Sequence, residues 1–184
     1  MRQGKVSDKQ YLSADEYLSD IWHLASQVRR GGWQPDVLIA LWRGGAPVGV
    51  AVHEFLKVTG WKPRHIAVKC FSYSGIGENE NEVRFEYADE VVNALKPGER
   101  VLVVDDVFDT GKTAAAIKVR LDARGVDMRL ATVYWKPTKN RTTLKPDFYV
   151  RELPDRWIVF PHEMEGLTPE ELVEKDPQLK DLMP

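Results

Sequence analysis

The sequence predicts an α/β fold in which helices flank a mostly parallel, twisted sheet. Short apolar runs typical of buried strands alternate with segments of helical periodicity, and this order is typical of parallel sheets covered on both faces. Polar or aromatic residues follow three of these runs directly, at Trp42-Arg43, Asp105-Asp106 and Lys136. Because parallel strands end at a common edge, we expect a ligand site where those three segments meet.

Each predicted element has its own local signal. The first helix begins after Ser13, which forms a capping box with Glu16, and it carries a broad apolar stripe that ends at Gly31-Gly32. The last helix begins at Thr168, an N-cap followed by Pro169 at the first helical position. Between them, buried strands are expected over residues 37–41, 65–71, 101–106 and 130–135, and helices over 47–58 and from residue 114.

The composition indicates one compact domain over residues 1–184, since 43% of these residues are hydrophobic. The formal net charge of −2 argues against a surface for nucleic acid, and no stretch resembles a membrane span or signal peptide, so we expect a cytoplasmic protein. The single cysteine, Cys70, is expected to be small apolar filler. The four histidines lack metal-ligand spacing, which argues against zinc.

The strongest functional signal follows the third predicted strand. This strand ends in Asp105 and Asp106, and a loop, Asp109-Thr110-Gly111-Lys112-Thr113, then leads into a helix. Hydroxyls and the backbone N–H groups of a helix N-terminus suit a phosphate, whereas carboxylates would repel one. We therefore expect the loop to bind a phosphate and the acidic pair to bind hydroxyl groups, a cation, or both.

Two other interpretations of this segment exist. The nucleotide P-loop G-x-x-x-x-G-K-[ST] shares Gly111-Lys112-Thr113, but its first glycine would fall at position 106, which is Asp106. A plain strand-to-helix turn, with Asp109 or Thr110 as the N-cap, would carry no chemistry. The missing glycine argues against the first interpretation, and the second stays open.

Residues 105–113 resemble the phosphoribosyl-pyrophosphate (PRPP) signature of the type I phosphoribosyltransferases. The resemblance implies that Asp105 and Asp106 hold the ribose hydroxyls and that residues 109–113 bind the 5-phosphate. It also implies that Asp109 lies near purine N7 and acts as a general base. The adjacent acids would stabilise the positive charge that develops on the ribose as pyrophosphate leaves.

Two upstream segments match the same family. Trp42, Arg43 and Gly44 resemble its pyrophosphate loop, particularly the Arg-Gly-Gly form of bacterial xanthine-guanine phosphoribosyltransferases, in which Arg43 would meet pyrophosphate oxygens. Ser72 and Tyr73 open a polar segment and resemble the Ser-Tyr pair of the flexible loop that closes over PRPP and excludes water. An ordinary turn and an exposed hairpin are the alternatives for these two segments.

Base recognition is expected in the C-terminal part of the chain. Lys136, Trp157 and Ile158 are placed like the Lys-Pro and Trp-Ile pairs of 6-oxopurine phosphoribosyltransferases, where the lysine donates to the 6-oxo group and the ring stacks on the base. A donor-only ammonium favours this carbonyl over the amino group of adenine. By the same resemblance, residues 147–163 form a small hood over the sheet edge, and Glu163 falls where related enzymes place an acid for a second metal ion.

The resemblance as a whole implies Mg²⁺-dependent transfer of the 5-phosphoribosyl group from PRPP to N9 of hypoxanthine, guanine or xanthine, with release of pyrophosphate. The Mg²⁺ would be carried mainly by PRPP oxygens and water, with Asp105 or Asp106 nearby. We expect a homodimer or homotetramer that acts in purine salvage. Two alternatives stay open: a PRPP transferase for another nitrogen base, and a nucleotide-sensing, RNA-binding regulator on the same fold, against which the net charge argues.

Overall fold

The computed structural model of the chain describes residues 9–73 and 82–182, which divide into two compact units. The larger unit lies within residues 19–155, and the smaller one combines residues up to 18 with those from 156 onward. Their boundary falls inside the first helix, α1 (Ala14–Arg30). Within the described ranges, no helix combines the length and the apolar character needed to cross a membrane. The single domain expected over residues 1–184 stays a prediction.

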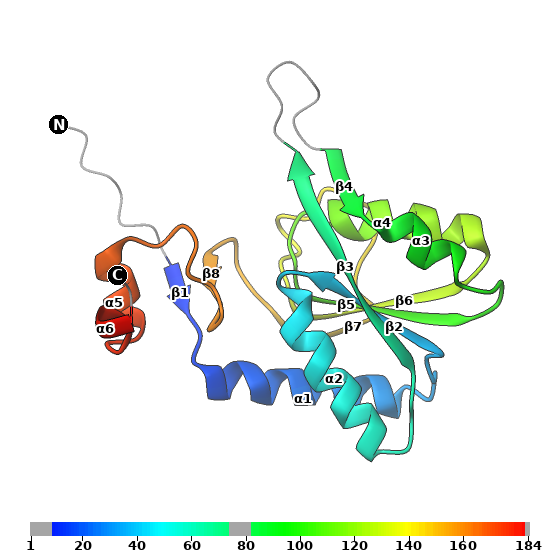
Figure 1. The fold of residues 1–184 in the computed structure, drawn as a ribbon, viewed down its shortest axis with the longest axis horizontal. Coiled ribbons are helices and arrows are strands. Elements are labelled where there is room, and N and C mark those ends of the chain that lie inside the picture. Colours follow the sequence, from blue (N-terminus) through cyan, green and yellow to red (C-terminus); the bar gives the residue numbers. More distant parts are fainter. Residues whose placement is uncertain (1–8, 74–81, 183–184) are drawn as a thin grey trace. The chain divides into compact units, whose positions relative to one another are not determined.

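The larger unit is built on a six-stranded sheet in the order β4-β3-β2-β5-β6-β7 (Figure 1). Neighbouring strands run parallel except for β3 and β4, which are antiparallel, so the predicted mostly parallel sheet is confirmed. The strands are β2 (Val37–Trp42), β3 (Arg64–Tyr73), β4 (Glu82–Glu86), β5 (Arg100–Phe108), β6 (Asp127–Trp135) and β7 (Phe148–Glu152).

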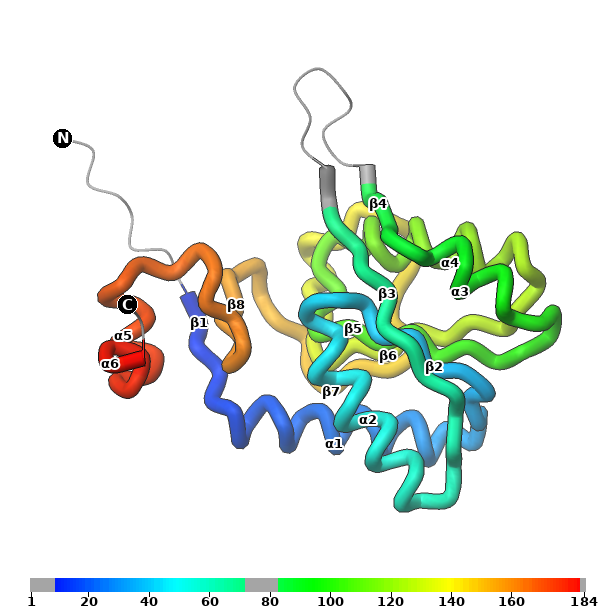
Figure 2. The backbone as a smooth tube through the Cα atoms, in the orientation of Figure 1, coloured from blue at the N-terminus to red at the C-terminus, as the bar shows by residue number. Residues whose placement is uncertain are grey.

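Helices cover both faces of this sheet, which explains why its central strands are apolar throughout. The chain passes from β2 to β3 through α2 (Gly45–Val58), and from β5 to β6 through α4 (Lys112–Arg124) (Figure 2). In Figure 1, α2 lies on one side of the sheet, whereas α4 and α3 (Ala88–Asn93) lie on the other. Asp20 of α1 accepts hydrogen bonds from Tyr134 and Arg151, each at 2.7 Å, and ties this helix to β6 and β7.

Alternate residues of β2 serve the two layers. Ile39 and Leu41 belong to the core cluster that includes buried side chains of α3 and α4. Ala40 faces α2, because a Cβ added to Gly49 would lie only 2.6 Å from the Cβ of Ala40. Because successive side chains point to opposite, helix-covered faces, β2 has no solvent-facing side. Polar side chains therefore gather at the carboxyl ends of the strands.

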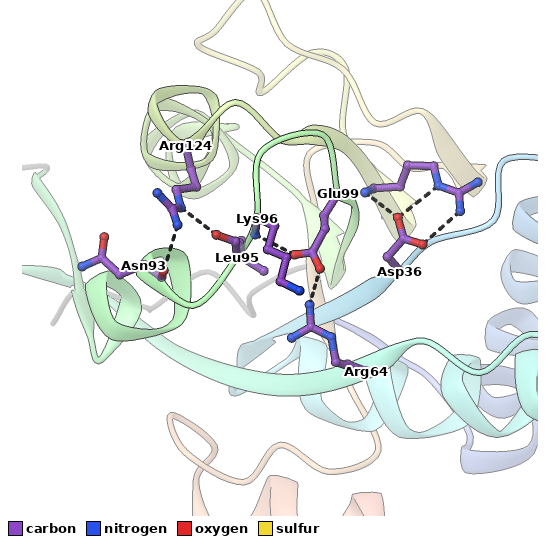
Figure 3. Close-up of polar contacts among 8 residues, drawn as sticks. Asp36, Arg64, Asn93, Leu95, Lys96, Glu99 and Arg124 are labelled. Carbon is purple, nitrogen blue, oxygen red and sulfur yellow. Dashed lines mark hydrogen bonds and ion pairs between the residues drawn. The ribbon is translucent and has the colours of Figure 1, made fainter.

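Polar contacts join the amino-terminal ends of three strands, at the edge opposite the predicted site (Figure 3). Asp36 accepts a hydrogen bond from the backbone N–H of Arg100 at 2.9 Å and from its guanidinium at 3.0 Å. Arg64 donates to Glu99 at 2.6 Å, and Glu99 also accepts from the Lys96 backbone N–H at 2.9 Å. The hydrogen bonds from Arg100 hold the pKa of Asp36 below its usual value.

The smaller unit contains a two-stranded parallel sheet of β1 (Lys9–Tyr11) and β8 (Trp157–Val159). Helices α5 (Pro169–Lys175) and α6 (Leu179–Leu182) follow near the C-terminal end of the chain. The N-cap predicted at Thr168 is confirmed, because Thr168 and Glu171 form a capping box. Lys9 forms a salt bridge of 2.6 Å with Glu171 and so links β1 to α5.

Three predicted boundaries differ from the structure. Strand β5 continues through Phe108 alongside β6, so Asp105 and Asp106 lie inside the strand and not at its end. Strand β3 includes Ser72 and Tyr73, which pair with β4, and the rest of the predicted polar loop, 74–81, lies outside the described residues. The first part of the expected hood is β7, an edge strand of the larger sheet.

Candidate functional site

Three loops meet where the central strands end. Trp42 is the last residue of β2, and β5 pairs with β2 on one side and with β6 on the other, so the segments after these strands lie near one another. A Cβ added to Gly44 would lie 1.9 Å from Asp106 Oδ2, and one added to Gly45 would lie 2.5 Å from the carbonyl oxygen of Val104. The Arg-Gly-Gly loop therefore rests directly on the acidic segment, and any side chain at position 44 would collide with a carboxylate.

The acidic pair is crowded and poorly exposed to water. The Asp105 side chain accepts from the Asp106 backbone N–H at 3.0 Å, and the Asp106 side chain accepts from the Val107 backbone N–H at 2.6 Å. Burial, reinforced by the negative charge of Asp106, raises the pKa of Asp105 well above its usual value. Because two poorly exposed carboxylates repel each other, they are stabilised by a shared proton, a bound cation or hydroxyl donors between them.

The loop between β5 and α4 has the shape expected of an anion-binding turn. Gly111 precedes the helix with φ +77°, a left-handed conformation that favours glycine, and its Cβ would lie 2.6 Å from Thr142 Oγ1. A cavity of about 70 Å³ is lined by Asp105, Thr110, Thr113 and other residues of this segment. The helix N-terminus and two hydroxyl-bearing side chains thus surround one small hollow.

A turn after β6, which was not predicted from the sequence, supports this loop. The backbone N–H of Arg141 donates to the carbonyl of Thr110 at 2.9 Å, and Gly111 packs against Asn140 and Thr142. Asn140 Oδ1 accepts from the Thr142 backbone N–H at 2.9 Å, which is the Asx-turn pattern. The Asn-x-Thr spacing was the available signal, but its contact with Gly111 depends on the tertiary fold.

Asp109 forms ion pairs with two lysines. Lys136 Nζ lies 3.3 Å from Asp109 Oδ2, and Lys139 Nζ lies 3.1 Å from the same oxygen. Lys136 is 4% exposed, so it is a buried lysine and not a solvated one on the surface. The hydrogen bond to Asp109 raises the pKa of Lys139, a residue to which the sequence analysis assigned no role. The predicted base and the predicted 6-oxo donor are therefore in contact with each other.

The side of the site near β3 holds Trp42, Arg43 and Cys70. Trp42 is half exposed and is joined to the exposed Arg43 by a cis peptide bond. The Cys70 thiol donates to the carbonyl oxygen of Trp42 at 3.4 Å. Burial, with the charges of Asp105 and Asp106 adding to it, raises the pKa of Cys70 to about 12, so this thiol is not a nucleophile at neutral pH.

The remaining predicted residues, Trp157, Ile158 and Glu163, belong to the smaller unit. Trp157 is 48% exposed, and Lys9 Nζ lies 4.6 Å from the centre of its ring, whereas Ile158 is buried. The Glu163 carboxylate accepts from the Phe160 backbone N–H at 3.2 Å. The roles expected of these three residues toward a purine and a metal stay predictions.

Comparisons with known proteins agree with this geometry. The family model described as phosphoribosyl transferase domain matches residues 7–167. The chain is 32% identical over 88 residues to a hypoxanthine-guanine phosphoribosyltransferase of Lactococcus lactis, a match that covers 48% of this chain and about half (46%) of that protein.

Solved structures show the same fold. A purine phosphoribosyltransferase from Pyrococcus horikoshii is 28% identical, with a TM-score of 0.68 over 88% of this chain and 98% of the other. A hypothetical protein from Neisseria gonorrhoeae, solved with bound ppGpp, is 22% identical, with a TM-score of 0.73 over 96% and 98% of the two chains. The family model spans most of the chain and includes the acidic pair and the loop after it. The chain therefore belongs to the phosphoribosyl transferase domain family.

Proposed function

We propose that this protein transfers the 5-phosphoribosyl group from PRPP to N9 of a 6-oxopurine, namely hypoxanthine, guanine or xanthine, and releases pyrophosphate. The observation that carries the proposal is the close approach of the Arg-Gly-Gly loop to the acidic pair, beside the phosphate-binding turn at Gly111. The names of the Lactococcus and Pyrococcus relatives support a purine as the acceptor. We further propose a cytoplasmic homodimer or homotetramer that acts in purine salvage.

The donor would occupy the edge formed by β2 and β5. The 5-phosphate would accept hydrogen bonds from the turn at residues 110–113, while ionised Asp105 and Asp106 would accept from the two ribose hydroxyls. As the bond from C1 to pyrophosphate breaks, the ribose becomes positively charged, and the two carboxylates stabilise that charge from fixed positions. Arg43 would bind pyrophosphate oxygens, and the segment that follows Ser72 and Tyr73 at the end of β3 would exclude water.

The acidic pair also fits a Mg²⁺ ion. Its carboxylates are the oxygen ligands that Mg²⁺ prefers, and burial, together with the charge of Asp106, raises the pKa of Asp105, so a nearby cation would favour its ionised form. Within the described ranges, no cluster of three or more His, Cys, Asp or Glu side chains could enclose a metal, so substrate oxygens and water would complete the shell. When bound, the ion would neutralise charge on the departing pyrophosphate. Glu163 would serve a second ion.

The acceptor would lie beside Asp109 and Lys136. The Lys136 ammonium would donate to the 6-oxo group, and Asp109 would accept the proton at N7 so that N9 becomes a better nucleophile. Trp157 would stack on the base, and Ile158 would contribute to the same purine contact. The ion pair between Asp109 and Lys136 supports this assignment. Lys136 Nζ lies 3.3 Å from Asp109 Oδ2, so a single purine could contact both groups.

Pyrophosphate release tests the proposal. The protein is incubated with PRPP, Mg²⁺ and each of hypoxanthine, guanine, xanthine, adenine and uracil, and turnover is expected only with the first three. Turnover of adenine or uracil alone would overturn the assignment of Lys136. Calorimetry that detects no uptake of PRPP with Mg²⁺ would overturn the whole proposal. Saturable binding of RNA at low salt would instead favour the regulatory alternative.

The general-base role predicts a specific defect in Asp109→Ala. This variant should bind PRPP with unchanged affinity but lose about 100-fold or more in kcat, the range expected when a general base is removed. Steady-state kinetics and calorimetry measure the two quantities. Asp122→Ala is the control, because Asp122 is an exposed acid on α4 that pairs with Lys118. An unchanged rate in Asp109→Ala would remove this residue from the mechanism.

A further inference from the structure

Lys139 lies between two carboxylates at the acceptor side of the site. Its Nζ is 3.1 Å from Asp109 Oδ2 and 3.3 Å from Asp155 Oδ1. Its backbone N–H donates to the Lys136 carbonyl at 3.1 Å, and the Lys136 N–H donates to the Phe108 carbonyl at 2.9 Å. Backbone hydrogen bonds thus hold the turn that carries both lysines against the strand that leads to Asp109.

Both lysines form ion pairs with the same oxygen of Asp109, Oδ2. The other oxygen, Oδ1, is buried and has no hydrogen-bond partner among the described residues. The negative charge of Asp109 is therefore compensated at Oδ2, by Lys136 and Lys139 together. Neither lysine is paired with Oδ1, so Oδ2 is the oxygen through which the two lysines orient the carboxylate.

The two lysines differ in their freedom. The Lys136 side chain is 5% exposed, whereas that of Lys139 is 36% exposed. Under the proposed function, the Lys136 ammonium donates to the purine 6-oxo group, so its ion pair with Asp109 must weaken. The Asp109 side chain is itself 32% exposed, so a second cation is needed to hold it in one orientation once Lys136 turns to the ligand.

We propose that Lys139 is a positioning residue that keeps the Asp109 carboxylate oriented while Lys136 turns to the purine. The inference rests on the proposed function and assigns a role to a side chain that touches neither substrate directly. Asp155, on the opposite side of Lys139, restrains the ammonium so that it stays within reach of Asp109.

Loss of Lys139 has a defined kinetic signature. Lys136 would then be the only cation on Asp109, and the purine would have to compete with that carboxylate for it. The KM for the purine should rise about tenfold and kcat should fall about tenfold, while the affinity for PRPP stays within about twofold, because the acidic pair and the phosphate turn are unchanged.

Kinetics of Lys139→Met and Lys139→Arg with a 6-oxopurine test the inference. Methionine removes the charge but keeps the apolar stem, and arginine should restore most of the activity. Lys118→Met is the matched control, since the Lys118 side chain is 39% exposed and also pairs with a carboxylate, that of Asp122. In an Asp109→Asn background, adding Lys139→Met should cost much less than it does alone.

The outcomes separate the two proposals. Unchanged purine KM and kcat in Lys139→Met would overturn the role of Lys139, and so would a loss that arginine fails to restore or that appears equally in PRPP affinity. Urea unfolding of each variant shows whether a loss of activity reflects a loss of folding. If the unmodified protein turns over no 6-oxopurine, the proposed function fails first, and the inference with it.

Discussion

A buried carboxyl group beside another carboxylate is a destabilising feature of a folded protein. Burial and the charge of Asp106 raise the pKa of Asp105, so the folded state holds the Asp105 proton more tightly than the unfolded chain does. This contributes stability at low pH that is progressively lost as pH rises from the unfolded pKa of about 4 toward the folded value. Near neutral pH the acidic pair therefore lowers the stability of the fold. Such a loss of stability is expected at a site whose charges serve to bind a ligand.

The variant Asp105→Asn should be more stable than the unmodified protein at pH 8. Asparagine has the same shape and carries no charge, so we expect a rise in Tm of about 3 °C, which corresponds to about 1 kcal/mol in a protein of this size. The difference should shrink at pH 5, because the lower pH favours the protonated form of Asp105. Thermal unfolding at both pH values measures the effect, and an equal Tm difference at pH 5 and pH 8 would contradict the raised pKa. PRPP binding should be lost.

Among the elements, α2 links packing to the site most directly. Its first residue, Gly45, lies against the Val104 carbonyl, and one turn later Gly49 lies against Ala40 of β2. Two glycines thus set the distance between this helix and the sheet. Because the Arg-Gly-Gly loop leads straight into α2, a shift of the helix also moves Gly44 relative to Asp106.

The variant Gly49→Ala should destabilise the protein, although alanine is the better helix former by about 1 kcal/mol. The added methyl would lie 2.6 Å from the Cβ of Ala40 and 3.5 Å from Cγ2 of Val104, and this overpacking should outweigh the gain and leave a net loss of about 1 kcal/mol. Val50→Ala is the control, because Val50 is 68% exposed and its truncation should change stability by less than about 0.5 kcal/mol. Urea unfolding compares the two, and a stabilised Gly49→Ala would show that α2 can move away from the sheet.

At the scale of the whole molecule, the two ends of the sheet respond to pH in opposite directions. Hydrogen bonds from Arg100 lower the pKa of Asp36, and the Lys96 N–H and Arg64 lower that of Glu99. A lowered pKa contributes stability that is present above the unfolded value of about 4 and is lost as pH falls through the folded value. Asp105 has the opposite dependence, so stability should be greatest at an intermediate, mildly acidic pH.

The double variant Asp36→Asn, Glu99→Gln should lose less stability on acidification than the unmodified protein. Between pH 5 and pH 2.5 its urea midpoint should fall by a smaller amount, because the contacts drawn in Figure 3 no longer titrate. Both acids are partly exposed, so salt screens their contacts. The difference between the two proteins in the fall of the urea midpoint should therefore be smaller in high salt. Parallel pH profiles for the two proteins, with no change in slope, would exclude these acids as a source of acid sensitivity.

Most of the larger sheet, and the closeness of the acidic pair to the turn at Gly111, could be predicted from the sequence because those signals are local. Asp105, Asp106 and Gly111 lie in one strand–loop–helix segment, and burial on both faces makes the central strands continuously apolar. Lys139 could not be predicted, since its role depends on a turn after β6 that folds back beside the loop after β5. The extension of β3 through Tyr73 was missed because pairing with β4, and not local composition, determines where that strand ends.

The pairing of β1 with β8 ties the beginning of the described chain to a segment near its other end. If Lys9–Tyr11 were deleted, the backbone of Trp157–Val159 would become an open edge, ready to recruit a strand from another molecule. Versions of the protein that lack Lys9–Tyr11 are thus prone to self-association or to exchange of this strand between copies.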